Sequence, residues 1–403
     1  MNPVRDRSPQ GDRIVITTDS DKVKCSNTSN LSIEVNNISN GVKLAELDYY
    51  LPKELIAQRP IKPRDHSKLL ILDRSTGSIK HLRFHNIIDY LNKGDILVLN
   101  NTRVIPCRLI AQRKSGGIVD MLLCQQDHKD KSIWTALINF NRRLGAKEEL
   151  ILSGDNTIKI QLCKRLKDGW LIKTQPIIDV QELQDIGKMP LPPYIKRTKT
   201  NDPYLRFDKN DYQTVYADKD GSIAAPTAGL HFTDRLITKL VDKGIRIIYV
   251  TLHIGLGTFK LIRIENIEKH QMEKEYFEVG PETMKILSEA YCDKKRIIAV
   301  GTTVCRVLET IADQIRMNMV HPLLEKQRIL RASLTRGWAD LFIHPPYQFK
   351  MVNSLVTNFH LPHGTPLALV SAFAGKEQIM KAYQEAITQK YRFYSYGDAM
   401  LIV

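Results

Sequence analysis

The apolar residues from Leu44 to about residue 175 fall into short runs separated by turn-forming residues, a pattern typical of β-strands. Lys68–Asp73 and Ile96–Asn100 are the first two runs, and Pro52 marks the start of a short helix before them. No helical period appears between residues 100 and 175, where further runs recur: Gly117–Leu123, Trp134–Ile138, Glu149–Leu152, Thr157–Ile160 and Trp170–Lys173. Short strands that recur in this way predict a small all-β barrel.

Helical and strand patterns alternate in the remainder of the chain. Thr233 can cap a helix that Gly244 ends, because the apolar residues between them recur at helical spacing. Two buried strands and a second helix are also expected, at Ile245–Leu252, at Ile297–Val300 and from Thr302 or Thr303 through Ile315. This alternation is typical of an α/β domain.

These patterns predict an α/β (α+β) main domain with a smaller all-β barrel domain inserted into it. We assign residues 44–98 and 176–403 to an α/β catalytic domain and residues 99–175 to the inserted barrel. Residues 1–43 are rich in Ser, Thr, Asn and Asp and lack sustained periodicity, so we expect a flexible N-terminal extension.

Composition narrows the class of protein. The 403 residues carry a net charge of +15, which favours a polyanionic partner such as nucleic acid, although lysines on solvated surfaces would give the same count. No apolar run approaches the roughly 20 residues that a membrane span needs. The six cysteines include no C-x-x-C pair, so a disulfide framework or a zinc site is not expected. We therefore expect a cytoplasmic protein.

Two segments combine small residues with a histidine. Gly221–Phe232 presents Thr227 and His231 just before the capped helix, and it fits either a ligand cradle or a tight strand-to-helix connection equally well. In Thr251–Phe259, His253 ends a predicted strand beside Gly255. A histidine there can act as an acid or base, but a structural histidine is the commoner case.

Three further segments are candidates for ligand binding. Val300–Glu309 runs from a strand through glycine into hydroxyl residues that open a helix, although its Arg306 and Glu309 could simply pair with each other. Asn358–Pro366 contains two histidines but no carboxylate or cysteine at ligand spacing, so no metal is expected. Tyr391–Met400 is dense in aromatic residues and suits either base stacking or a packed C-terminal element.

Long segments of residues 44–403 together carry a family resemblance. They are Tyr50–Gln58, Gly94–Leu109, Met189–Ile195, Tyr212–Ala217, Ala224–Phe232, Leu252–Phe259, Gly301–Thr303, Val356–Pro362 and Tyr391–Met400. In this order they resemble the S-adenosylmethionine:tRNA ribosyltransferase-isomerase family of queuosine biosynthesis. Each segment alone would be a weak signal, but so many in one order are specific.

The resemblance implies an RNA-modifying transferase and isomerase. The ribosyl part of S-adenosylmethionine would move onto 7-aminomethyl-7-deazaguanine at the tRNA wobble position and isomerise. The products would be epoxyqueuosine-tRNA, adenine and methionine. No metal or bound cofactor is implied, because S-adenosylmethionine is a consumed substrate. We expect the partners to be S-adenosylmethionine and this tRNA, with no membrane, and the protein to be a monomer.

Residue chemistry and motif position suggest roles within that reaction. We expect His231 and His253 to transfer protons, and Thr227 and Glu309 to orient the substrate. The residues expected to hold S-adenosylmethionine are Gly301, Thr302, Thr303, Asn358 and Gly255. Those expected to meet RNA are Arg103, Arg392 and Tyr396.

The sequence departs from the family pattern at four positions. Glu273 stands where the family often has a histidine, within His270–Glu275, so a catalytic role for that histidine cannot be general. The others are Pro346 for a usual glycine, Asn353 for a usual aspartate and Gly364 for a common serine. The core motifs are retained, so we expect the protein to be active. Reduced or altered activity is the alternative expectation.

Two other functions fit parts of the sequence. An S-adenosylmethionine-dependent RNA methyltransferase would need a Gly-rich fingerprint after its first strand, which we do not find. A non-catalytic RNA-binding protein could use the barrel as an OB-like module, but it would not need the histidine loops outside the barrel. Release of adenine separates all three functions.

Overall fold

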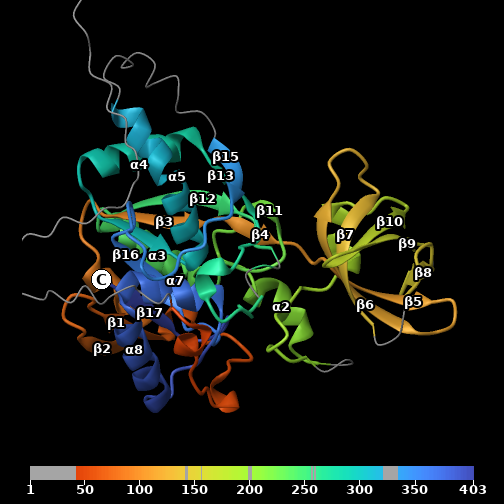
Figure 1. Cartoon of the computed structure of the whole chain (residues 1–403), viewed down its shortest axis with the longest axis horizontal. Helices are drawn as coiled ribbons and strands as arrows, with labels where there is room; N and C mark the ends of the chain where they lie inside the picture. The colour runs from red at the N-terminus through yellow and green to blue at the C-terminus, as the bar shows by residue number, and fades with distance from the viewer. Residues whose placement is uncertain are drawn as a thin grey trace, which may run out of the picture. The chain divides into compact units, whose positions relative to one another are not determined.

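The structure is a computed structural model, and it describes residues 42–140, 144–155, 157–197, 202–255, 257, 260–320 and 335–403 (Figure 1). The expected N-terminal extension, apart from its last two residues, lies outside these ranges. No helix within them is both long enough and apolar enough to cross a membrane.

A mixed sheet forms the centre of the main domain. Its nine strands within the described residues are, from one edge to the other, β15 (Thr335–Ala339), β13 (Glu275–Val279), β12 (Arg246–Leu252), β3 (Ile96–Asn100), β14 (Ile297–Val300), β16 (Ser354–Asn358), β17 (Ala399–Ile402), β1 (Lys68–Leu72) and β2 (Ile79–Arg83). The neighbours β12, β3, β14 and β16 are parallel, so their carboxyl ends meet at one edge. Such an edge is the usual ligand site of an α/β sheet.

Both faces of this sheet are covered, which explains why its central strands are almost continuously apolar. Leu97 and Leu99 pack with α3 (Asp234–Asp242) and a 3₁₀ segment, η4 (Phe84–Tyr90), on one face. Ile96 and Val98 face the opposite way. The helices that contribute to the core on that second face are α4 (Pro281–Cys292), α5 (Thr302–Val320), α7 (Thr365–Ala374) and α8 (Lys376–Thr388).

Local sequence signals place the α3 helix. The Thr233 hydroxyl accepts a hydrogen bond from the backbone N–H of Leu236, as an N-cap does, and Gly244 follows the helix with a φ of 87°. This confirms the helix predicted between these two residues. The helix expected to end near Ile315 is α5, and it continues to Val320.

Between β4 (Thr102–Val104) and β11 (Lys219–Ser222) in the sequence, the chain forms a closed barrel of six antiparallel strands. β4 and β11 pair with each other, and the barrel lies to one side of this pair (Figure 1). Its strands are β5 (Arg108–Arg113), β6 (Ile118–Gln126), β7 (Ile133–Asn139), β8 (Glu149–Leu152), β9 (Lys159–Leu166) and β10 (Gly169–Gln175). Alternate residues of these strands fill a separate core around Trp134 and Trp170. The two short helices α1 (Val180–Ile186) and α2 (Leu205–Asp211) follow the barrel. The α/β domain with a β-barrel in its chain is the fold class that the sequence predicts.

Candidate active site

A pocket opens at the carboxyl ends of β12, β14 and β16. Its lining residues come from segments far apart in the sequence: Tyr194, Ala224–Ala228, Ile254, Lys260, Leu261, Gly301–Thr303, Thr357–Leu361, Gly364, Pro366, Tyr394 and Ser395.

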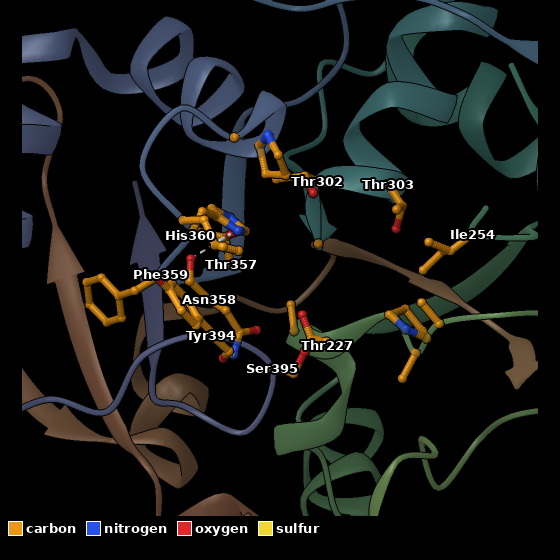
Figure 2. Close-up of a pocket in the computed structure, with 18 of the residues that line it drawn as sticks. Thr227, Ile254, Thr302, Thr303, Thr357, Asn358, Phe359, His360, Tyr394 and Ser395 are labelled. Carbon is orange, nitrogen blue, oxygen red and sulfur yellow. Dashed lines mark hydrogen bonds between the residues drawn. The ribbon is translucent and has the colours of Figure 1, made fainter. Parts of the chain in front are cut away.

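Backbone of the β14–α5 junction forms one wall of the pocket. Gly301 has a φ of 96°, a conformation that glycine adopts easily, and the chain turns there directly from strand into helix. Thr302 and Thr303 therefore stand at the start of α5, where free N–H groups can meet an anion or carboxylate (Figure 2). Thr227, at the start of η5 (Thr227–His231), also lines the pocket.

Asn358, at the end of β16, lies in the wall of the pocket and is 2% exposed. Its Nδ2 donates a hydrogen bond to the carbonyl of Tyr394 over 3.1 Å, which fixes the orientation of the amide because a carbonyl can only accept. Its Oδ1 is buried and has no partner among the described residues. A ligand that donates a hydrogen bond to Oδ1 would remove the unfavourable burial of this acceptor.

His231 is buried beside Asn358, behind the pocket, and does not line it. Its Nε2 lies 3.3 Å from Nδ2 of Asn358, and its Nδ1 lies 2.7 Å from the Ser67 hydroxyl. Since Asn358 presents N–H, Nε2 accepts and Nδ1 carries the proton. Burial, aided by the nearby charges of Arg392 and Arg64, lowers the pKa of His231 to about 3. A neutral histidine held in this way is better suited to orienting the Asn358 amide than to transferring protons.

His253 also lies outside the lining residues of the pocket. Its Nδ1 lies 2.8 Å from the Thr102 hydroxyl, and its ring stacks on Tyr276. A Cβ on Gly221 would come within 3.0 Å of the imidazole, so glycine is needed there for close packing. Burial lowers the pKa of His253. The neighbouring residue Ile254 faces the pocket instead, as expected where side chains alternate along an extended chain.

Glu309 is 2% exposed and is absent from the pocket lining. Its carboxylate accepts hydrogen bonds from the backbone N–H groups of Lys350, Met351 and Val352. The Arg306 guanidinium pairs with Glu275 instead of with Glu309, so the possible Arg306–Glu309 pair is not found. Glu309 holds a loop, which leaves the expected role in orienting substrate without structural support.

Gly255 also serves the scaffold, since its N–H donates to Glu275 and the residue is outside the pocket lining. Among the expected ligand residues, the structure thus brings together Thr227, Gly301, Thr302, Thr303 and Asn358.

The residues expected to meet RNA differ in exposure. Arg103 is partly exposed and donates to the carbonyl of Ala217. Arg392 pairs with the buried Asp398, and together with Tyr396 and His231 it lines a separate small cavity. Tyr396 is 2% exposed and its ring meets Tyr212 edge-on. Tyr396 thus belongs to a packed C-terminal element, and its ring has no free face on which an RNA base could stack.

His360 is a pocket residue that the assignment of roles missed. Its Nε2 lies 2.7 Å from the Thr357 hydroxyl (Figure 2), and burial lowers its pKa to about 3. It stands in the segment Val356–Pro362 that carries the family resemblance, but no sequence signal separated it from His363. The structure separates them, since His363 pairs with Asp48 and is absent from the pocket lining.

Two of the departures from the family pattern have structural explanations. Glu273 forms an ion pair with Lys260 at the pocket, and Lys260 also lies 3.3 Å from Asp168 in the β9–β10 turn of the barrel. Asn353 accepts a hydrogen bond from the backbone N–H of Ile297 through Oδ1, which an aspartate oxygen could do equally well. Nothing in the structure explains Pro346. Gly364 begins α7 without a side-chain cap.

The described residues contain no group of three or more His, Cys, Asp or Glu side chains placed to hold a metal ion. The fold is that of an α/β protein with an additional β-barrel. Its pocket can bind a small polar molecule at the carboxyl ends of the parallel strands.

Comparison with known proteins identifies the family. The model of the family described as "Queuosine biosynthesis protein" matches residues 44–402, so the chain belongs to that family. Proteins named S-adenosylmethionine:tRNA ribosyltransferase-isomerase from Sulfurihydrogenibium sp. (strain YO3AOP1) and Halothermothrix orenii are 44% and 46% identical over 363 and 366 residues. Each alignment covers 90% of this chain and 100% of the relative.

A Thermotoga petrophila protein of the same name is 46% identical over 363 residues, again 90% of this chain and the whole relative. A crystal structure of an S-adenosylmethionine tRNA ribosyltransferase from Thermotoga maritima is 37% identical and has a TM-score of 0.47, covering 89% of this chain and 100% of that chain. The family model and the three relatives named S-adenosylmethionine:tRNA ribosyltransferase-isomerase confirm the family that the sequence segments resemble.

Proposed function

We propose that this protein transfers the ribosyl part of S-adenosylmethionine onto 7-aminomethyl-7-deazaguanine at the tRNA wobble position and isomerises it. Epoxyqueuosine-tRNA, adenine and methionine are the products. The observation that carries this proposal is that the segments shared with the family converge on one pocket: Ala224–Ala228, Ile254, Gly301–Thr303 and Thr357–Leu361.

The side chains and backbone groups that line the pocket suit the chemistry of S-adenosylmethionine. Gly301, Thr302 and Thr303 offer backbone N–H groups and hydroxyls to its carboxylate or ribose, and Thr227 lies in the facing wall. Asn358 offers an unpaired acceptor to a ligand N–H or O–H donor. The walls also contain apolar groups such as Ile254 and Phe359, which exclude water from a charged substrate.

S-adenosylmethionine acts as a substrate in this proposal, and no cofactor stays bound between turnovers. The net charge of +15 favours association with tRNA. Arg103 is an exposed candidate for phosphate contact, and Arg392 is a less exposed one. The protein works as a monomer in the cytoplasm.

The test is incubation with S-adenosylmethionine and tRNA that carries 7-aminomethyl-7-deazaguanine, followed by mass spectrometry of nucleosides and small molecules. Epoxyqueuosine with stoichiometric adenine and methionine is the expected result. The matched control is the same tRNA with guanine at the wobble position, which should not react. S-adenosylhomocysteine would identify a methyltransferase, whereas unchanged reactants with folded protein would indicate an RNA-binding protein.

A further inference from the structure

We propose that the small cavity lined by Arg64, Arg392 and Tyr396 binds one backbone phosphate of the tRNA, beside the wobble nucleotide. This inference rests on the proposed function, because it gives the tRNA of that reaction a contact next to the pocket. The lining of the cavity comes from three parts of the chain, within residues 60–67, 230–231 and 392–397. The argument depends on an unpaired charge, on two unpaired donors and on where the cavity lies.

Arg64 brings to the cavity a positive charge that no carboxylate of the described residues neutralises. Its guanidinium donates hydrogen bonds to the backbone carbonyls of Asn210 and Gln213, and it forms no ion pair within the described ranges. Asp211 attracts this charge, but its carboxylate pairs with Lys62 over 3.0 Å. Burial lowers the pKa of Arg64, yet a guanidinium stays protonated in proteins. A partly buried charge of this kind is unfavourable until an anion pairs with it.

Two buried donors at the cavity have no hydrogen-bond partner among the described residues. They are Nε of Arg392 and the hydroxyl of Tyr396, a residue that is 2% exposed. The Arg392 Nε–H can only donate, and burial raises the pKa of Tyr396, so its hydroxyl keeps its proton. Buried donors in folded proteins normally have a partner. A ligand that accepts hydrogen bonds from both groups would supply it.

The charges around the cavity fit an oxyanion with a single negative charge. Asp398 pairs with Arg392 over 3.0 Å. Asp208, whose charge acts on a hydroxyl of the cavity, pairs with Arg197 over 2.7 Å. Of the charged groups at this cavity that the structure describes, Arg64 is thus left without a counter-charge. A phosphodiester carries one negative charge, and arginine and tyrosine side chains are common donors to its oxygens.

The cavity lies beside the pocket proposed for S-adenosylmethionine. Ser395 lines both, and His231 of the cavity contacts Asn358 of the pocket. Burial lowers the pKa of His231, and the charges of Arg392 and Arg64 lower it further, so both charges act at this shared wall. Both arginines are partly exposed, so an RNA strand can approach them from the surface. A nucleotide whose base enters the pocket carries a phosphate on each side of its sugar, and one of these would occupy the cavity.

Tyr396→Phe is the first test, because it removes only a hydroxyl that no described residue binds. We expect binding of full-length tRNA to weaken about tenfold, measured by fluorescence anisotropy at low salt, because a hydrogen bond to a charged acceptor is lost. Affinity for S-adenosylmethionine should stay within about twofold of wild type.

Tyr216→Phe is the matched control, since it deletes another buried hydroxyl without a partner among the described residues, and Tyr216 lines neither the cavity nor the pocket. Its tRNA affinity should stay within about twofold of wild type. Unchanged tRNA affinity in Tyr396→Phe would overturn the proposal. Weaker binding of S-adenosylmethionine alone would also overturn it, and would assign the cavity to the carboxylate of that substrate.

Arg64→Gln tests the charge. We expect tRNA binding to weaken about 10- to 150-fold, and the slope of log affinity against log salt concentration to become smaller by about one. Tyr396→Phe should keep the wild-type slope, because a neutral donor releases no counterion. If Arg64 serves only to hold the carbonyls of Asn210 and Gln213, Arg64→Gln would be less stable but would keep the wild-type slope. That result contradicts the proposal.

A modified tRNA shows which phosphate is bound, and it decides the question where Arg64→Gln does not fold. The phosphate on the 5′ or the 3′ side of the wobble nucleotide is replaced by a neutral methylphosphonate, and the adjoining 2′ hydroxyl is methylated here and in the reference tRNA. At one of the two positions, wild type should lose about tenfold in affinity and Tyr396→Phe much less, because both changes remove the same contact. Equal losses in the two proteins at both positions would overturn the proposal.

These binding measurements do not require turnover. Failure of the proposed function would appear differently, as wild-type protein that binds tRNA but releases neither adenine nor methionine.

Discussion

Asn358 and His231, 127 positions apart in the sequence, share a hydrogen bond of 3.3 Å between Nδ2 and Nε2. This contact joins the wall of the pocket to the buried core in which His231 stacks on Phe84. Because the Tyr394 carbonyl takes the other amide hydrogen, Oδ1 of Asn358 is left as an unpaired acceptor. The His231 imidazole and the Tyr394 carbonyl thus hold the Asn358 amide in one orientation.

Asn358→Leu removes the acceptor while keeping a side chain of similar size. An unpaired buried acceptor is unfavourable by about 1–3 kcal/mol, so we expect its loss as a ligand partner to weaken binding of S-adenosylmethionine about 5- to 150-fold. Isothermal titration calorimetry measures the change, and thermal unfolding checks that the variant is folded. Unchanged affinity in a folded variant would mean that Oδ1 does not contact this substrate.

His231 should make stability fall as the pH is lowered. In the unfolded chain its pKa is about 6.5, whereas in the folded protein it is about 3. Between these values the unfolded state binds the additional proton, so the free energy of unfolding decreases toward acid by up to about 1.4 kcal/mol per pH unit. His231→Gln should flatten this slope in urea unfolding at pH 7.5, 6 and 5. Parallel slopes for wild type and variant would contradict the interpretation.

The sequence predicted those parts of the fold that depend on local patterns. Thr233 and Gly244 bounded a helix because capping is a local property, and apolar runs located the barrel strands. The sequence also located the segments that form the pocket. It could not show which side chain of each segment faces the pocket, because that depends on distant contacts. His253 and Ile254 are neighbours, yet Ile254 lines the pocket and His253 packs against Gly221.

Glu309 illustrates the same limit, and it leads to a prediction about stability. Glu309→Ala would leave three backbone N–H groups, those of Lys350, Met351 and Val352, without their acceptor. We expect a loss of about 3 kcal/mol in the free energy of unfolding. The exposed Glu289→Ala in α4 is the control and should change it by less than about 0.5 kcal/mol. A stable Glu309→Ala variant with low turnover would instead support a role with the substrate.

Lys260 connects the barrel to the pocket, since its ammonium meets Glu273 and lies 3.3 Å from Asp168. All three side chains are well exposed, so each pair should contribute less than about 1 kcal/mol to stability. Their effect on ligands should be larger, because the two carboxylates offset a positive charge in the pocket wall. Asp168→Asn with Glu273→Gln should therefore lower KM for tRNA by about two- to tenfold at low salt, and less at higher salt.

Lys260→Met tests the same charge from the opposite direction. It should raise KM for tRNA, and it should remove the effect of the Asp168→Asn and Glu273→Gln pair, because both carboxylates act through the ammonium. Steady-state kinetics of adenine release at two salt concentrations compare wild type, the Asp168→Asn/Glu273→Gln variant, Lys260→Met and the variant with all three substitutions. If the two neutral substitutions lower KM equally with and without Lys260, the carboxylates act by repelling RNA directly. In that case the contact between barrel and pocket has no part in binding.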